Sequence, residues 1–198
     1  MSSIARTVQE QVQNFQLGHI FSVDEFESLG QSTAVYQELH RLKLQGRINR
    51  IQNGVYYKPE PNRILKGRFL SPDIYEAVKV VAKKNGESVQ IHGGMAANRL
   101  GLSTQVPVME VFYTSGNSRE FMIGGTRIRM IHTKNVKFFQ YPLNHRVGLA
   151  ISALLFQGKE IVNAEMIEKL KKTLSVEELM QLKQSSLPAW LHKVLNNR

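Results

Sequence analysis

The stretch Gln31–Pro59, QSTAVYQELHRLKLQGRINRIQNGVYYKP, decides the fold of the N-terminal part of this chain of 198 residues. Its first half opens with Ser32, a favourable helix N-cap. The apolar residues that follow recur at the spacing of one buried helix face: Val35, Leu39 and Leu42. Gly46 can adopt the left-handed conformation that ends a helix. The pattern therefore predicts a helix from Ser32 to about residue 45, with one face in a core.

A basic hairpin is predicted directly after this helix. Two β-prone runs, RINRI and VYYK, flank Gln52-Asn53-Gly54, and Asn-Gly is a strong hairpin signal. Two further helices are predicted upstream, over residues 3–15 and, capped by Ser22, over residues 21–26. Three helices followed by a hairpin within about sixty residues are typical of a winged helix-turn-helix. We therefore expect such a DNA-binding domain over residues 1–60.

The predicted DNA-binding residues lie on the polar face of this helix and on the hairpin. On the helix they are Ser32, Thr33, Tyr36, Gln37, His40, Arg41 and Lys43. On the hairpin they are Arg47, Arg50, Asn53 and Lys58. The helix residues can exchange hydrogen bonds with base edges, and the basic hairpin residues can contact phosphates. The alternative is that they only form an exposed polar surface. Either Tyr56 or Tyr57 should pack on the core, and the pattern leaves open which one.

The charge distribution supports a polyanionic partner. The chain has 26 basic and 16 acidic residues and a formal net charge of +10. Residues 31–68 hold eight basic and two acidic residues, a net charge of +6. A basic block that coincides with a helix and a hairpin is the electrostatic pattern of a nucleic-acid binder. The alternative is that the charge serves only solubility.

A second domain is predicted after a linker. Two prolines, Pro59 and Pro61, interrupt regular structure, and residues 61–70 form a basic connector. Residues 71–198 then predict a mixed α/β domain: a helix to residue 85, a short strand, a brief helix, three strands and a helical end from residue 144. The fold class predicted for the whole chain is α+β.

No pattern for catalysis or cofactor binding is found. The chain has no cysteine, no phosphate-binding glycine loop, no hydrolase nucleophile elbow and no metal-binding histidine pair. His92, before Gly93-Gly94, is the one histidine that suggests catalysis, and a local hydrogen-bonding role fits it better. We expect a protein that is not an enzyme, with no catalytic residue, metal or cofactor. The absence of a signal core and of a long apolar run predicts a cytoplasmic protein that does not bind membranes.

Two motifs give a resemblance to a known family. Gly54-Val55-Tyr56-Tyr57-Lys58-Pro59 and the run AANRLGLSTQVP, residues 96–107, resemble the AbiEi-like antitoxins of bacterial abortive-infection (type IV toxin–antitoxin) systems. The resemblance covers roughly residues 5–140. It implies an antitoxin for phage defence that represses its own operon through the N-terminal domain. It also implies that the C-terminal domain counters a nucleotidyltransferase-like toxin, often without stable contact.

Three functions are weighed on these grounds. The first is the autorepressing antitoxin, which binds double-stranded DNA of its own promoter, alone or as a homodimer, with the toxin as functional partner. The second is a stand-alone winged-helix regulator whose second domain senses a ligand or dimerises. The third is an RNA-binding or RNA-modifying accessory protein that would use Arg127 and Arg129. The residues 96–107 favour the first, and a toxin gene next to this one would separate it from the second.

Overall fold

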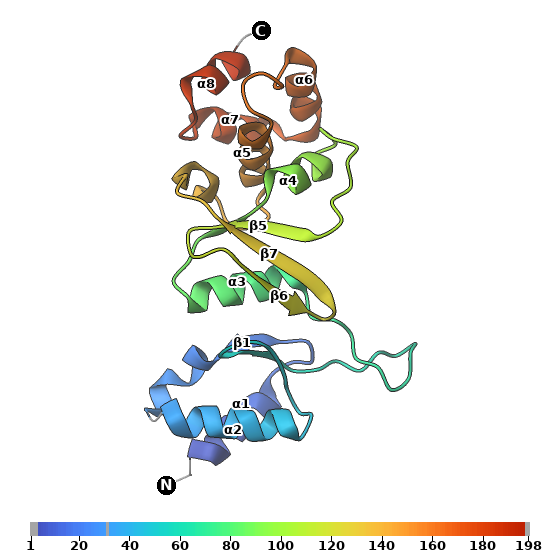
Figure 1. Ribbon diagram of the computed structural model, residues 1–198, viewed down its shortest axis with the longest axis vertical. Coiled ribbons are helices and arrows are strands. Elements are labelled where there is room, and N and C mark those ends of the chain that lie inside the picture. The colour runs from blue at the N-terminus through green and yellow to red at the C-terminus, as the bar shows by residue number, and fades with distance from the viewer. Residues whose placement is uncertain (1–3, 31, 197–198) are drawn as a thin grey trace. The chain divides into compact units, whose positions relative to one another are not determined.

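The computed structural model describes residues 4–30 and 32–196, and it has the mixed α+β composition that the sequence predicts (Figure 1). By its internal contacts the chain divides into two compact units. The first comprises Met1–Gly86 together with Phe121–Thr126, and the second comprises Glu87–Glu120 together with Arg127–Arg198.

Among its described residues, the first unit contains four helices and one small sheet. Along the chain its elements are α1 (Ile4–Asn14), β1 (Ile20–Ser22), the 3₁₀ helix η1 (Val23–Leu29), α2 (Ser32–Leu44), β2 (Asn49–Gln52), β3 (Val55–Tyr57) and α3 (Ile74–Lys84). Ser22 caps η1 as predicted, because its side chain and that of Glu25 form a reciprocal capping box. Ser32 is the first residue within α2 rather than its predicted N-cap, and the preceding Gln31 lies outside the described residues.

The sheet of the first unit has the strand order β1-β3-β2, and both pairs are antiparallel. The predicted hairpin is present as β2 and β3, with a register shift between Arg50 and Gln52. β1, which the sequence did not reveal, pairs Phe21 with Tyr56. A strand of three residues that leads directly into a capped helix is too short to produce an alternating pattern.

The core of the first unit lies between α1, α2 and this sheet. It contains Val8, Val12, Phe21, Phe26, Val35, Leu39, Leu42, Ile48 and Tyr56. Tyr56 is the tyrosine that turns inward, with its ring 5.8 Å from that of Phe21. Tyr57 is half-buried, and its hydroxyl accepts a hydrogen bond from Asn49 at 3.1 Å. The burial of Val35, Leu39 and Leu42 in this core confirms the predicted buried face of α2.

The boundary between the units differs from the linker that the sequence predicts at residues 61–70. α3 contacts β1 and β3, so the internal contacts group it with the first unit and place the division after Gly86. An apolar stripe explains this packing, because Ala77, Val78 and Val81 are fully buried. The predicted helix itself is present, and Asp73 caps it.

The second unit combines a four-stranded sheet with a helical end. Its elements are β4 (Val89–Ile91), α4 (Gly93–Arg99), β5 (Glu110–Thr114), β6 (Arg119–Ile123), β7 (Thr126–His132), the 3₁₀ helix η2 (Val136–Phe139), α5 (Arg146–Gln157), α6 (Ala164–Thr173), α7 (Val176–Gln184) and α8 (Ala189–Asn196). The segment Phe121–Thr126, which joins the end of β6 to the start of β7, is the one that the internal contacts assign to the first unit. The strand order is β4-β5-β7-β6, with β5 and β7 parallel. Arg129 of β7 forms an ion pair with Glu120 of β6 at 3.6 Å.

α5 is the central helix of the second unit, and residues 147–154 are all buried. It packs against α4, where Ala96 and Ala97 are fully buried and Gly93 lies against Phe156 and the Ser152 carbonyl. A side chain at Gly93 would collide with both. The small residues Ala96 and Ala97 thus allow α4 and α5 to pack closely.

Candidate nucleic-acid interface

The outer face of α2 is a polar surface from Ser32 to Lys43, and the exposed Leu44 follows at its C-terminal end. All seven residues predicted there are exposed: Ser32, Thr33, Tyr36, Gln37, His40, Arg41 and Lys43. Val35, Leu39 and Leu42 point the opposite way into the core, which fixes the orientation of the helix about its own axis. The face combines hydroxyl, amide, imidazole and ammonium groups, so it can both donate and accept hydrogen bonds at base edges.

Arg41 lies at one edge of this face and is held by an ion pair. Its guanidinium donates from Nε to Glu38 Oε2 at 2.9 Å and from Nη2 to Glu38 Oε1 at 2.8 Å. Gln9 of α1 donates to the same carboxylate at 2.8 Å. Glu38 is only 5% exposed, so these donors satisfy a buried charge and connect α2 to α1. The structure thus gives Arg41 a stabilising role that the sequence did not predict.

The hairpin turn holds two predicted residues together. Arg50 donates from Nη2 to Asn53 Oδ1 at 2.9 Å and from Nε to the Gln52 carbonyl at 3.2 Å. Both Arg50 and Asn53 are exposed. Gly54 is buried beside them with a φ of +70°, and its carbonyl accepts from the Val23 amide at 2.9 Å. The turn is therefore short and lies against the start of η1.

Tyr36 connects the helix face to this turn. A side chain at Gly54 would meet the Tyr36 hydroxyl, so the two lie next to each other. Burial raises the pKa of Tyr56, the Arg50 charge acts in the opposite direction and Tyr36 adds to the increase, as expected for neighbouring groups. The exposed surface of α2 thus continues through Tyr36 to Arg50 and Asn53.

Lys58 and Arg47 occupy different surroundings. The Lys58 ammonium donates to the carbonyls of Gln13 and Phe15 at 2.7 Å each. It thereby caps the C-terminal end of α1, where a cation is favourable. The structure does not place this ammonium with the α2 residues. Arg47 is exposed directly after α2, and its backbone amide donates to the Leu42 carbonyl at 3.0 Å.

The first unit carries a second group of cations, which the sequence did not identify as a candidate binding surface. Arg63, Lys66 and Arg68 belong to the basic connector that the sequence predicts at residues 61–70. All three are exposed. They lie on a projecting hairpin that has its own hydrogen bonds.

His92 has the local role that the sequence favoured. Its Nδ1 accepts from the Gly94 amide at 3.3 Å, which caps α4. The ring lies between those of Tyr113 and Phe156, each with its centroid 4.8 Å away. Burial lowers the pKa of His92, which keeps the imidazole neutral and able to accept. Among residues 4–30 and 32–196, no three metal-ligating side chains gather at one place.

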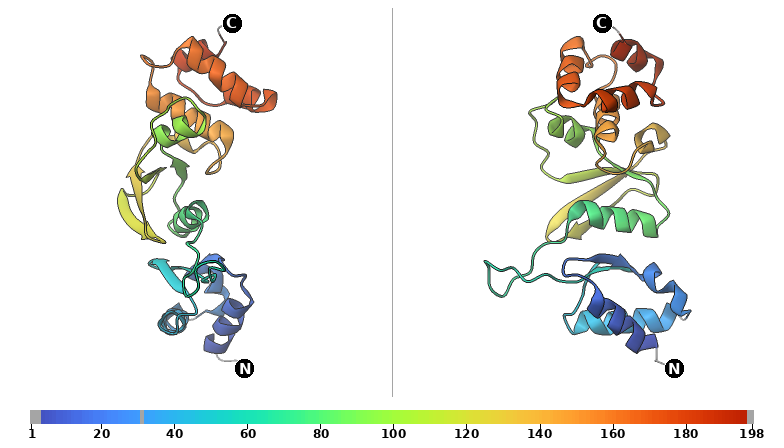
Figure 2. Two further views of the ribbon diagram at one scale, coloured as in Figure 1. Left: turned by 90° about the vertical axis from the view of Figure 1, so that its right-hand side faces the viewer. Right: turned by 180° about the vertical axis from the view of Figure 1, so that it is seen from behind.

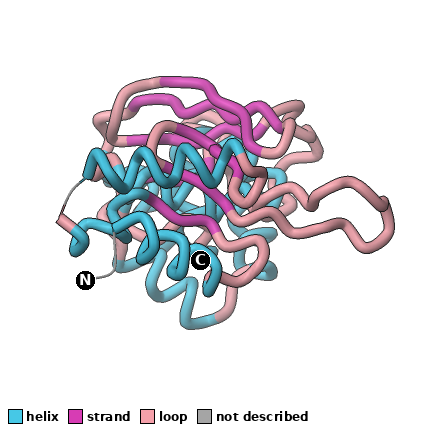
Figure 3. Tube along the Cα trace, turned by 90° about the horizontal axis from the view of Figure 1, so that it is seen from below, coloured by secondary structure: helices cyan, strands magenta, loops and turns pink. Residues whose placement is uncertain are grey.

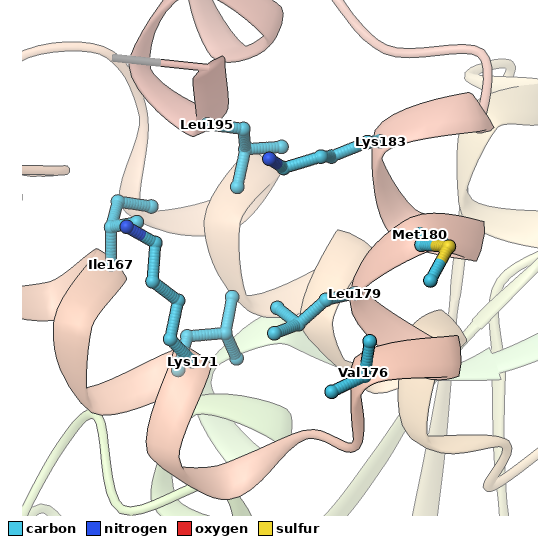
Figure 4. A pocket seen from close by; sticks show the side chains of 8 residues that line it. Ile167, Lys171, Val176, Leu179, Met180, Lys183 and Leu195 are labelled. Carbon is cyan, nitrogen blue, oxygen red and sulfur yellow. The ribbon is translucent and has the colours of Figure 1, made fainter. Parts of the chain in front are cut away.

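An apolar groove lies between the last three helices (Figure 4). Its volume is about 220 Å³. It is lined by Ile167, Leu170, Lys171, Val176, Leu179, Met180, Lys183 and Leu195. Val176 and Met180 are among the exposed apolar residues of the chain, so the groove is open to solvent. Its lining suits a small apolar ligand.

Comparison with known proteins places the chain in one family. Residues 7–182 match the model of a family of unknown function, DUF6088, and the chain belongs to it. No curated protein and no solved structure matches the chain significantly. Within the described residues, no helix has the length and apolar character needed to cross a membrane.

Proposed function

We propose that this protein is a sequence-selective DNA-binding regulator that uses the outer face of α2 to contact base edges. One observation carries the proposal: the exposed face of α2 is polar from Ser32 to Lys43, before the exposed Leu44 at its end, while its opposite face is fixed in the core. Arg47 and Arg50 lie just beyond the helix, where a duplex would present its phosphates. The chain's net charge of +10 favours the same partner.

The order of elements supports a winged helix-turn-helix. η1 precedes α2 across a short turn, and the hairpin β2–β3 follows. β1 adds a third strand beside β3. In proteins of this class the second helix of the motif enters the major groove. The hairpin here ends in a short turn against Val23, so it would contribute Arg50 and Asn53 rather than a long wing.

The direct test is a binding assay with DNA from upstream of the protein's own coding sequence. A gel shift with an unrelated competitor should show preferential binding, and a reporter driven by that upstream DNA should be repressed. The Thr33→Ala/Gln37→Ala double variant should lose both effects while remaining folded. Equal binding to all sequences by the unmodified protein would contradict the proposal.

The more specific proposal is an autorepressing antitoxin, and it rests on the resemblance at residues 54–59 and 96–107. Under it, the protein should rescue cells that express a nucleotidyltransferase-like toxin encoded beside it. The α2 variant should still rescue them, because repression and neutralisation are assigned to different parts of the chain. Failure of rescue by the unmodified protein would contradict the antitoxin role and leave the DNA-binding proposal standing.

A ligand-responsive regulator is the second candidate. The groove between α6, α7 and α8 favours it, because it offers an open apolar site with two lysines at its edge (Figure 4). A small apolar carboxylate suits that chemistry. A ligand of this kind that changes DNA affinity would support this candidate, and the Leu179→Ala variant should abolish the response.

A further inference from the structure

The segment that follows the wing forms a projecting hairpin, here called the arm and defined as residues 60–70. Pro61 pairs with Phe69 in an antiparallel bridge. The Asn62 amide donates to the Arg68 carbonyl, and the Leu70 amide donates to the Glu60 carbonyl, both at 2.8 Å. The arm extends past the C-terminal end of α2 in Figure 1, and it projects likewise in the right-hand view of Figure 2 and in Figure 3.

The side chain of Asn62 holds the turn at the tip of the arm. Asn62 Oδ1 accepts from the amides of Ile64 and Leu65, at 2.9 Å each. The Arg68 amide donates to the Leu65 carbonyl at 3.1 Å, and Gly67 supplies a φ of +80°. An asparagine that binds two following amides forms a defined turn. The arm is thus a formed hairpin rather than an unstructured linker.

The side chains of the arm are arranged for contact with something outside the chain. Arg63, Lys66 and Arg68 are exposed, and none of them forms an ion pair within the described part of the chain. Ile64 is 89% exposed and Leu65 is 51% exposed at the tip. No acidic residue lies between positions 61 and 70. Apolar residues held at the end of a cationic hairpin contribute nothing to the core, so a partner must explain them.

The chemistry of the arm matches the DNA minor groove. Proteins that bind there use arginine and lysine along the backbone and insert apolar wedges between base steps. Each leg of about five residues reaches roughly 15 Å, enough to cross one phosphate backbone beside the major groove. The arm belongs to the same unit as α2 and extends beyond its end, where Lys43 and Arg47 are also exposed.

We propose that the arm enters the minor groove next to the DNA segment that α2 contacts, with Arg63, Lys66 and Arg68 on the phosphates and Ile64 and Leu65 as a wedge. This inference rests on the proposed DNA-binding function. It adds a second contact that the wing does not supply. It also predicts that the protein bends its DNA, because an apolar wedge partly unstacks a base step.

The test compares two variants with the unmodified protein on the duplex from upstream of its coding sequence. The first is Arg63→Ala/Lys66→Ala/Arg68→Ala. Its control is Lys134→Ala/Lys159→Ala/Lys193→Ala, which removes the same charge at exposed positions of the second unit. The arm variant should reduce the slope of log affinity against log salt by about two to three, and the control should leave it unchanged. Circular dichroism should show all three proteins equally folded.

The second variant, Ile64→Ala/Leu65→Ala, tests the wedge. Energy transfer between dyes at the two ends of the duplex should report a bend with the unmodified protein and a smaller bend with this variant, while the salt slope stays the same. Netropsin, which occupies the minor groove, should weaken binding of the unmodified protein and leave the Arg63/Lys66/Arg68 variant little affected.

The outcomes separate this inference from the proposed function. An unchanged salt slope in the arm variant, with sequence-selective binding intact, would overturn the arm's role alone. No binding of any DNA by the unmodified protein would overturn both proposals. A third outcome would assign the arm to a membrane surface and overturn the minor-groove contact. In it, the unmodified protein binds vesicles of phosphatidylcholine and phosphatidylglycerol, the arm variant does not, and both proteins bind DNA equally.

Discussion

Arg41 and Glu38, three residues apart on α2, form a two-pronged ion pair whose carboxylate is buried at the boundary with α1. The guanidinium therefore cannot turn freely toward DNA without leaving a buried charge unpaired. The predicted site thus contains two kinds of residue. Some have no structural task in the described contacts, and others, such as Arg41, stabilise the fold.

Removing this pair should affect stability more than DNA recognition. We expect Arg41→Ala to lower the free energy of unfolding by about 1 kcal/mol, because the partly exposed guanidinium is screened by solvent. Glu38→Ala should cost a similar amount, and the double variant should cost less than the sum. Chemical denaturation measures all three. Independent, additive effects would show that Arg41 and Glu38 are not coupled energetically.

Lys58 should stabilise α1. Lys58→Ala removes two hydrogen bonds to the last carbonyls of that helix, and we expect a loss of about 1 kcal/mol. The matched control is Lys66→Ala, which should leave stability unchanged because Lys66 is an exposed residue of the arm. If Lys58→Ala melted normally and reduced the salt slope of DNA binding, its predicted phosphate contact would be favoured instead.

Acid should destabilise the second unit through His92. Burial lowers the folded-state pKa of His92 below its ordinary value of 6.5, so the unfolded chain binds the proton more readily. The stability that the neutral ring contributes is fully present above about pH 6.5 and is lost as the pH falls from there toward the folded-state pKa. His92→Asn keeps an acceptor for the Gly94 amide but cannot titrate.

Thermal melting of both proteins at several pH values tests this expectation. The difference in melting temperature between the His92→Asn variant and the unmodified protein should shift in favour of the variant as the pH falls below 6.5. A constant difference across that range would show that protonation of His92 is not coupled to folding.

The sequence predicted the elements well where one face is buried. The periodicity of Val35, Leu39 and Leu42 located α2, and the Asn-Gly pair located the hairpin. The seven predicted residues of the helix face are exposed because the same periodicity that identifies the buried side also identifies the outer one.

What the sequence could not predict depends on contacts between distant residues. Lys58 caps a helix whose carbonyls lie more than forty positions earlier, and no local pattern reveals this. Tyr56 turns inward because β1 pairs with β3 and because the register shifts at the hairpin, features that periodicity does not determine. Pro61 and the basic residues of the arm predict a linker, and the two hydrogen bonds by which Asn62 holds the hairpin leave no local sequence pattern.

The central claim is that the outer face of α2 determines which DNA sequence is bound. The most direct measurement selects preferred sites from a pool of random duplexes with the unmodified protein and with the Gln37→Ala/His40→Ala variant. Both residues are exposed, so the variant should keep its melting temperature. We predict that the unmodified protein enriches a defined sequence and that the variant loses preference at particular base positions. Enrichment of the same sequence by both proteins, with equal affinity, would contradict the account.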